Sequence, residues 1–137
     1  MEIRFENKVA FITGAAGGIG YAAARMFAEA GASVVMADLD SRVTDRAKEL
    51  EAEGHNALGI RCDVSDEAQV KAAVEKAVAV FGKLDIAYNN VGIHAAVRED
   101  LAETEGWDFD RVISVNLRGV WNCMKYELVE MKKHGKG

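Results

Sequence analysis

The stretch Thr13-Gly14-Ala15-Ala16-Gly17-Gly18-Ile19-Gly20 decides the fold, because it joins a β-type run to a helical one. The run Val9–Ile12 before it is continuously apolar, which is typical of a buried strand. After it, apolar residues recur at helical spacing, and the glycines predict a tight turn that opens onto a helix N-terminus. The residues expected on the buried face of that helix are Ile19, Ala22, Ala23, Met26, Phe27 and Ala30.

The same alternation of strand and helix continues outward from this turn. The further predicted strands are Ser33–Ala37, Ala57–Arg61 and Leu84–Tyr88, and the further predicted helices are 40–53, 65–81 and 104–134. Strands that alternate with helices are typical of a parallel sheet covered by helices. We therefore expect an α/β fold, in one domain over residues 1–137.

Several local expectations can be compared with the structure. Ser65 is expected to cap the third helix, with Gly54 and Gly82 ending the second and third helices. A solvated loop face is expected at Arg98, Glu99 and Asp100. A contribution to the core or to an oligomer contact is expected of Trp107, Phe109 and Trp121.

The composition limits the classes of function. The 137 residues include 17 basic and 22 acidic ones, for a net charge of −5, and half are hydrophobic. A globular domain with an acidic balance argues against disorder and against nucleic-acid or anionic-membrane binding through charge. The longest uncharged run is 16 residues, too short for a membrane span of about 20. No signal-peptide pattern is present, which favours a cytoplasmic location, and Cys62 and Cys123 lack metal-ligand spacing.

The glycine-rich turn also has a chemical interpretation. A pyrophosphate needs close backbone approach and the free N–H groups of a helix N-terminus, although a simple structural turn can require glycine as well. Asp38 ends the second predicted strand, 18 residues after Gly20. This is near the offset of about 20 at which a carboxylate binds an adenosine ribose. Together the two features indicate a dinucleotide site.

Four segments together resemble the short-chain dehydrogenase/reductase family. The first turn fits its TGxxxGxG pattern, and Cys62-Asp63-Val64 is similar to its adenine contact. Asn89-Asn90-Val91-Gly92 resembles its NNAG motif, with Val in place of Ala, and residues 114–120 resemble the helix that carries its catalytic Asn. These segments occur in the family's order and span nearly the whole chain.

The resemblance implies a Rossmann-type doubly wound parallel sheet of about four strands in the order 3-2-1-4, with NAD as cofactor. It also implies hydride transfer between the nicotinamide and an alcohol or carbonyl, with Asn116 as one catalytic residue whose helix opens to hold a water. Asp63 would accept the adenine amine, and the Val64 N–H would face the ring. The implied cofactor-binding residues are Gly14, Ala16, Gly17, Gly18, Ile19, Gly20, Asp38, Leu39, Asp63, Val64, Asn90, Val91 and Gly92.

The family's other catalytic residues, a Ser and a Tyr-xxx-Lys pair, have no match here. Tyr21, Tyr88 and Tyr126 are followed four places on by Arg, Gly and Glu. We therefore expect a truncated, cofactor-binding portion that is inactive alone. A non-catalytic dinucleotide-binding or assembly module, and an incomplete fragment without independent function, remain alternatives. The open sheet edge predicts a homo-oligomer or a partner that completes the sheet.

Cofactor choice follows from Asp38, whose carboxylate would accept both ribose hydroxyls and repel a 2′-phosphate. Arg42 is the only cation expected within a turn of it, and as an early helix residue it should point to solvent. NAD is therefore expected over NADP. His94, just past Gly92, is either a solvated loop residue or part of the substrate-facing loop.

Overall fold

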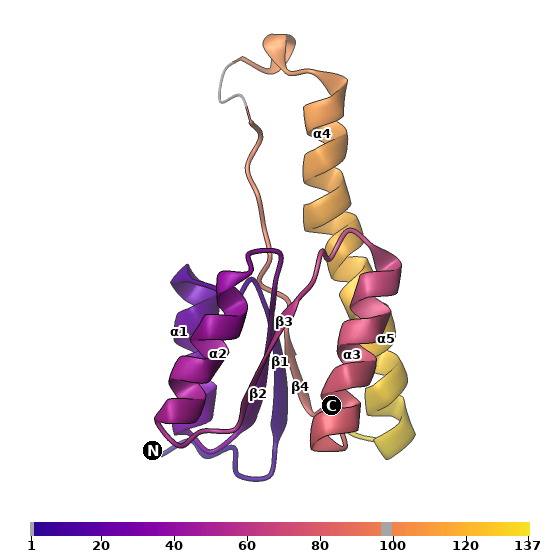
Figure 1. The fold of residues 1–137 in the computed structure, drawn as a ribbon. Helices are drawn as coiled ribbons and strands as arrows, with labels where there is room; N and C mark the ends of the chain where they lie inside the picture. Colours follow the sequence, from indigo (N-terminus) through magenta and orange to yellow (C-terminus); the bar gives the residue numbers. More distant parts are fainter. Residues whose placement is uncertain (1, 97–99) are drawn as a thin grey trace.

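The computed structural model describes residues 2–96 and 100–137 and is built on a parallel sheet (Figure 1). Its strands are β1 (Val9–Thr13), β2 (Ser33–Asp38), β3 (Ala57–Arg61) and β4 (Ile86–Tyr88). The strand order is β3-β2-β1-β4, and every neighbouring pair is parallel. The α/β fold and the 3-2-1-4 order expected from the sequence are confirmed, and the strand limits agree within two residues.

Helices cover both faces of this sheet. Helices α1 (Gly18–Glu29) and α2 (Arg42–Ala52) lie on one face, and α3 (Glu67–Phe81) and α5 (Val120–His134) lie on the other (Figure 1). Strand residues alternate between two buried clusters, with Ile12 and Met36 under α1 and α2, and Phe11 and Val35 under α3 and α5. This alternation explains why β1 and β2 read as continuously apolar in the sequence.

The last predicted helix is continuous but not uniform. After the short 3₁₀ turn Leu101–Glu103, α4 (Gly106–Ile113) is followed directly by a π-helical segment, Ser114–Gly119, and then by α5. Helix α4 extends beyond the carboxyl ends of the strands, beside the loop that leaves β4 (Figure 1). The π segment occupies the place where the resemblance implied an opened helix.

The buried face predicted for α1 was wrong in part, although Phe27 does pack against the core. Its buried residues are Gly20, Ala24 and Ala28, whereas Ile19 and Met26 are 72% and 69% exposed. A Cβ on Gly20 would lie 2.0 Å from the carbonyl oxygen of Gly14. The helix therefore approaches the sheet too closely for large side chains, and the face with the smallest residues turns inward.

The helix ends agree with the sequence in part. Asp66, and not Ser65, caps α3, because the Ser65 amide and hydroxyl donate to Asp63 Oδ1 while Asp66 accepts from two amides of the first turn. Gly54 and Gly82 have φ of +94° and +85° at the ends of α2 and α3, as expected.

Two other local expectations have mixed outcomes. The three aromatic residues assigned to a core or an oligomer contact are not core residues: Trp107, Phe109 and Trp121 are 58%, 62% and 52% exposed. Of the predicted loop face, Asp100 is exposed, whereas Arg98 and Glu99 lie outside the described residues.

Candidate active site

A cleft of about 760 Å³ lies beyond the carboxyl ends of the strands. The chain adds β2 and β3 on one side of β1 and then returns to place β4 on the other, so the topology switches direction here. In open parallel sheets, ligands bind at such a switch point. The residues that line the cleft are Gly14, Asp38, Leu39, Asp40, Cys62, Asp63, Val64, Ser65, Asn90, Val91, Gly92, Ile93, Arg111, Ser114 and Val115.

The glycine-rich turn reaches the cleft through Gly14, whereas the predicted site residues Ala16, Gly17, Gly18, Ile19 and Gly20 are not among the residues that line it. Gly14 has a φ of +66°, and a Cβ there would lie 3.0 Å from the side-chain nitrogen Nδ2 of Asn90. Gly17 caps α1 in an extended conformation, Gly18 is its first residue, and Ile19 is exposed. A Cβ on Gly17 would have no neighbour within 4 Å, so the space next to it is open.

Asp38 is held by the backbone on both of its carboxylate oxygens. Oδ2 accepts from the Ala16 amide at 2.9 Å, and Oδ1 accepts from the Asp40 amide at 2.9 Å. A carboxylate oxygen can accept two hydrogen bonds, so each retains capacity for a ligand hydroxyl. Leu39, the next residue, is 57% exposed and also lines the cleft.

Two arginines that the sequence interpretation missed lie on either side of Asp38. Arg46 Nε donates to the carbonyl of Ala16 at 3.3 Å, and Arg61 Nε donates to the carbonyl of Leu39 at 3.1 Å. The position of Arg61 could have been found from the register, because it pairs with Asp38 across β2 and β3. The expected cation Arg42 is exposed and binds Asp40, whose pKa its guanidinium holds below the usual range.

The Asp63 segment forms the wall beyond β3. Asp63 Oδ1 accepts from Ser65, which fixes the turn, and Val64 is buried against Gly119, where a Cβ would come within 2.6 Å of Val64 Cγ2. The carbonyl of Val64 accepts from the buried amide of Asn122 at 2.9 Å. The start of α5 thus sets the position of this wall. Burial, with nearby carboxylates, raises the pKa of the Cys62 thiol to about 11, so Cys62 is an unreactive thiol here.

The exit of β4 is attached to β1 and to α5. Thr13 Oγ1 accepts from the amides of Asn90 at 3.0 Å and Val91 at 3.3 Å. Asn89 Nδ2 donates to Glu127 Oε2 at 2.8 Å, while Asn89 Oδ1 and Glu127 Oε1 are buried and have no hydrogen-bond partner among residues 2–96 and 100–137. Burial raises the pKa of Glu127 to about 7, against the lowering effect of the Asn89 bond.

Asn116 reaches the site through the loop after β4. Its Oδ1 accepts from the Ile93 amide at 2.8 Å, and its Nδ2 donates to the Ile93 carbonyl at 2.9 Å. Asn116 does not itself line the cleft, whereas Ile93, Arg111, Ser114 and Val115 do, and none of these four was predicted. A helical residue was hard to assign to the cleft because the sequence does not show how far α4 extends beyond the sheet.

The tyrosines lie in other surroundings. Tyr21 lies between α1 and α2, where its hydroxyl donates to Glu49 and its ring lies 4.9 Å from the guanidinium of Arg46. Tyr126 donates to Glu67, whose carboxylate raises the pKa of the phenol. Neither residue lines the cleft.

Comparison with known proteins gives the family. Residues 8–137 match the sequence profile of the short chain dehydrogenase family, and the chain belongs to that family. A secoisolariciresinol dehydrogenase of Forsythia intermedia is 44% identical over 124 residues, covering 90% of this chain and 44% of that protein. A cyclohexanol dehydrogenase of an Acinetobacter strain is 41% identical over 140 residues, covering 100% of this chain and 55% of that protein.

Two further matches agree with this assignment. A cis-4-hydroxycyclohexanecarboxylate dehydrogenase of Sinomonas cyclohexanicum is 44% identical over 133 residues, covering 97% of this chain and 53% of that protein. The crystal structure of gox2181 has a TM-score of 0.94 and 29% identity, covering 99% of this chain and 53% of that chain. The chain thus spans about half the length of the curated relatives it matches.

Two searches of the described residues add to this picture. Within 2–96 and 100–137, no group of three or more His, Cys, Asp or Glu side chains could hold a metal ion. Over the same residues, no helix is long and apolar enough to cross a membrane.

Proposed function

We propose that residues 1–137 form one domain that binds NAD as the cofactor of a short-chain oxidoreductase. The observation that supports this proposal is that Gly14 and Asp38 line one cleft at the switch point of the sheet, and that Asp38 is hydrogen bonded to the glycine-rich turn at Ala16. The cleft volume of about 760 Å³ suits a small-molecule ligand. The open space beside Gly17 would admit a pyrophosphate at the N-terminus of α1.

The residues of the cleft divide between the two ends of the cofactor. Asp38, with one free acceptor position on each oxygen, would receive the adenosine ribose hydroxyls, and Asp63 and Val64 would receive the adenine. Gly92 and Ile93, which follow β4 on the other side of β1, would lie against the nicotinamide end. NAD would supply a hydride acceptor, and its reduced form a hydride donor.

For the whole protein we propose oxidation of an alcohol, or reduction of the corresponding carbonyl. The three relatives described above are named as dehydrogenases, two of them for ring alcohols. Asn116 is the one residue that we assign to catalysis here: its side chain holds the Ile93 backbone, and its carbonyl, in the π-helical segment, would hold a water. Cyclohexanol and cyclohexanone are therefore the first substrates to test.

A second proposal concerns assembly. Within the described residues, β4 pairs only with β1, so its other edge has no strand beside it. Trp121, Met124 and Leu128 on α5 are each about half exposed. An open parallel edge next to exposed apolar side chains favours a second copy, or a partner that supplies a further strand.

Calorimetric titration of NAD and NADH into the 137-residue chain tests the cofactor proposal. We expect saturable binding with one site per chain, and competition by AMP for the same site. Absence of binding at millimolar nucleotide would leave the fragment without independent function as the better interpretation. A pull-down from native lysate distinguishes a module with a partner from a chain that associates with itself.

A further inference from the structure

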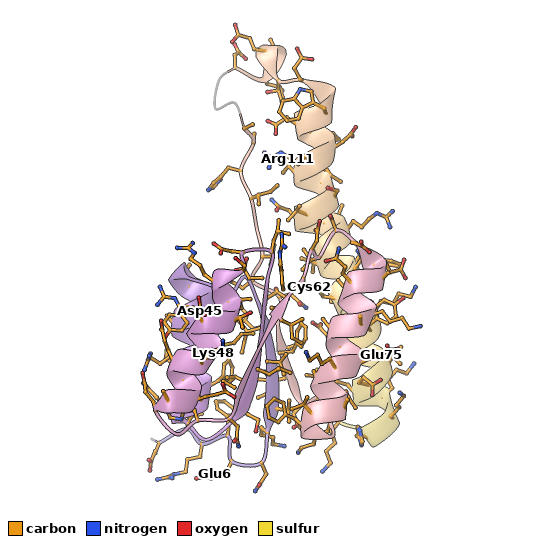
Figure 2. The ribbon with its side chains drawn as sticks, viewed as in Figure 1. Glu6, Asp45, Lys48, Cys62, Glu75 and Arg111 are labelled. Atoms are coloured by element: carbon orange, nitrogen blue, oxygen red, sulfur yellow. The ribbon has the colours of Figure 1, made fainter. Side chains whose placement is uncertain are left out.

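The loop that leaves β4 is bound by more than Asn116. Arg111 Nη2 donates to the carbonyl of His94 at 2.8 Å, and Asp108 Oδ2 accepts from the Ala96 amide at 2.7 Å. The loop and the helical segment run in opposite directions, so residues 93, 94 and 96 meet residues 116, 111 and 108 in turn. Figure 2 shows Arg111 on the part of α4 that stands beside this loop.

The π segment brings these side chains into one row. Asp108 and Arg111 are three residues apart and therefore share a face of α4. In a regular α-helix, a residue five places beyond Arg111 would be turned by about 140° away from it. The wider π turn over Ser114–Gly119 reduces that offset, so that Asn116 reaches the same loop.

The burial pattern of α4 does not fit ordinary packing. Asp108 is the buried residue of this helix at 1% exposure, while its neighbours Trp107 and Phe109 are 58% and 62% exposed. Burying a carboxylate is costly unless it is paired and hydrogen bonded. Arg111 supplies the pairing with two donors, Nη2 at 2.8 Å and Nε at 3.2 Å from Asp108 Oδ1. A buried carboxylate paired with a partly exposed arginine, next to exposed aromatic side chains, indicates that this face of the helix holds the loop rather than the core.

We propose that Asp108 and Arg111 are positioning residues that fix the His94–Ala96 backbone, and through it the adjoining residues Gly92 and Ile93, which line the cleft on its β4 side. Arg111 also lines the cleft itself, together with Ile93 and Ser114. The proposal rests on the proposed cofactor site and deepens it: the pair governs the end of the cleft that would receive the nicotinamide. Asp38 and Asp63 on the β2 and β3 side govern the other end independently.

Binding of NADH and of AMP to the same variants separates the two ends, because AMP carries only the adenosine part. Arg111→Met keeps the aliphatic stem and removes the donors. It is expected to weaken NADH binding by about 10-fold or more, as for the loss of one charge-assisted hydrogen bond. AMP binding should stay within about twofold, because the two ends lie apart. Arg111→Lys, which keeps the charge, should recover part of the NADH affinity.

Matched controls come from the same helical segment. Asp110→Asn and Arg118→Met remove the same kinds of charge from exposed positions that have no hydrogen bond to the part of the loop that the structure describes, and both should bind NADH as the wild type does. Asp108→Asn should resemble Arg111→Met. Equal losses of NADH and AMP affinity, or an unchanged NADH affinity in Arg111→Met, would overturn the positioning role.

Amide hydrogen exchange keeps the proposal testable without nucleotide. If the wild type binds neither NADH nor AMP, the proposed function fails, and the loop contacts are judged by exchange alone. The Ala96 amide should then be protected in the wild type and exchange faster in Asp108→Asn. Equal exchange in the two proteins would show that Asp108 does not hold the loop.

Discussion

The carboxylate of Asp38 and the backbone amide of Ala16, 22 residues apart in the chain, are joined by a hydrogen bond of 2.9 Å between Oδ2 and N. The bond ties the end of β2 to the glycine-rich turn. Asp38 therefore shapes the turn as well as facing the cleft. Substitutions at this position must separate these two roles.

Cofactor choice is the first prediction. The wild type should favour NAD over NADP by about two orders of magnitude, because the 2′-phosphate would replace charge-assisted bonds with like-charge repulsion. Asp38→Asn keeps an acceptor for the Ala16 amide while removing the charge. This variant should reduce the difference in affinity between NAD and NADP. Calorimetric titration of both cofactors measures it. Equal wild-type affinities, or no narrowing in Asp38→Asn, would show that Asp38 is not the selector.

The glycine-rich turn gives a matched pair of variants. Gly20→Ala would place a Cβ against the Gly14 carbonyl, and backbone cannot give way there, so we expect about 1 to 3 kcal/mol of lost stability. The Cβ added in Gly17→Ala would have no neighbouring atom within 4 Å, so this variant should unfold at the wild-type denaturant midpoint. If Gly17→Ala nonetheless binds NADH less tightly, a ligand passes close to Gly17. Equal unfolding midpoints for the two variants would contradict this assignment.

Glu127 makes stability depend on pH. Burial raises the pKa of Glu127 to about 7 in the folded chain, above the ordinary value of 4.5, so the folded state holds a proton that the unfolded state releases. Stability should therefore fall as pH rises from about 4.5 to about 7, and the lost stability should amount to a few kcal/mol. Glu127→Gln mimics the protonated form and should be more stable than the wild type at pH 8.

Urea unfolding at pH 5 and pH 8 measures this difference. The increase in the free energy of unfolding from wild type to Glu127→Gln should be small at pH 5 and large at pH 8. Glu75→Gln is the control, because Glu75 is exposed on α3 and its side chain points outward (Figure 2). A gain that is the same at both pH values would mean that Glu127 is ionised throughout.

The 137-residue chain alone should show no turnover. None of its tyrosines has a lysine four places on, and the hydroxyls of Tyr21 and Tyr126 are bound to Glu49 and Glu67 away from the cleft. Without a positioned acid, a factor of about 10² to 10⁴ in rate is missing. The assay follows NADH absorbance with cyclohexanol or cyclohexanone. Turnover by a protein of verified mass, lost on Asn116→Ala, would overturn the prediction.

The chain should self-associate through an interface formed by α5. We expect the chain to form dimers or larger species in light scattering, because apolar side chains of α5 adjoin the open edge of β4. Leu128→Glu should shift the distribution toward monomer. Val80→Glu changes an exposed apolar residue of α3 and should leave it unchanged. A stable monodisperse monomer at high concentration would count against an interface on α5.

The sequence predicted the fold well because its strongest signals are local. The strand limits, the end of α3 at Gly82 and the end of β2 at Asp38 follow from periodicity and turn chemistry. The inward face of α1 could not be predicted by hydrophobicity, because close approach at Gly20 selects small residues over apolar ones. The predicted site residues after β2, β3 and β4 line one cleft together with Gly14, since parallel strands end at one edge, whereas the other predicted residues of the glycine-rich turn do not line it.

What the sequence did not show depends on long-range geometry. Arg46 and Arg61 reach carbonyls beside Asp38 from α2 and β3, and nothing in their local sequence distinguishes them from surface arginines. Asp108 reads as a polar residue between two aromatics, which predicts exposure. Its burial arises only because the loop from β4 returns along α4. Such contacts follow from the fold and not from a motif.

The π segment also sets the rotation about the helix axis between the surface of α4 before it and the surface of α5 after it. A single extra residue changes the phase of everything after it by about 100°. Before the segment, the helix is aligned with the cleft through Asp108 and Arg111. After it, the helix is aligned with the sheet through Cys123 and Glu127. Deleting one residue between Ser114 and Gly119 would therefore keep the helix but turn one of these surfaces away from its neighbour, so an exposed position of this segment such as Leu117 should tolerate substitution more readily than the segment tolerates a change in length.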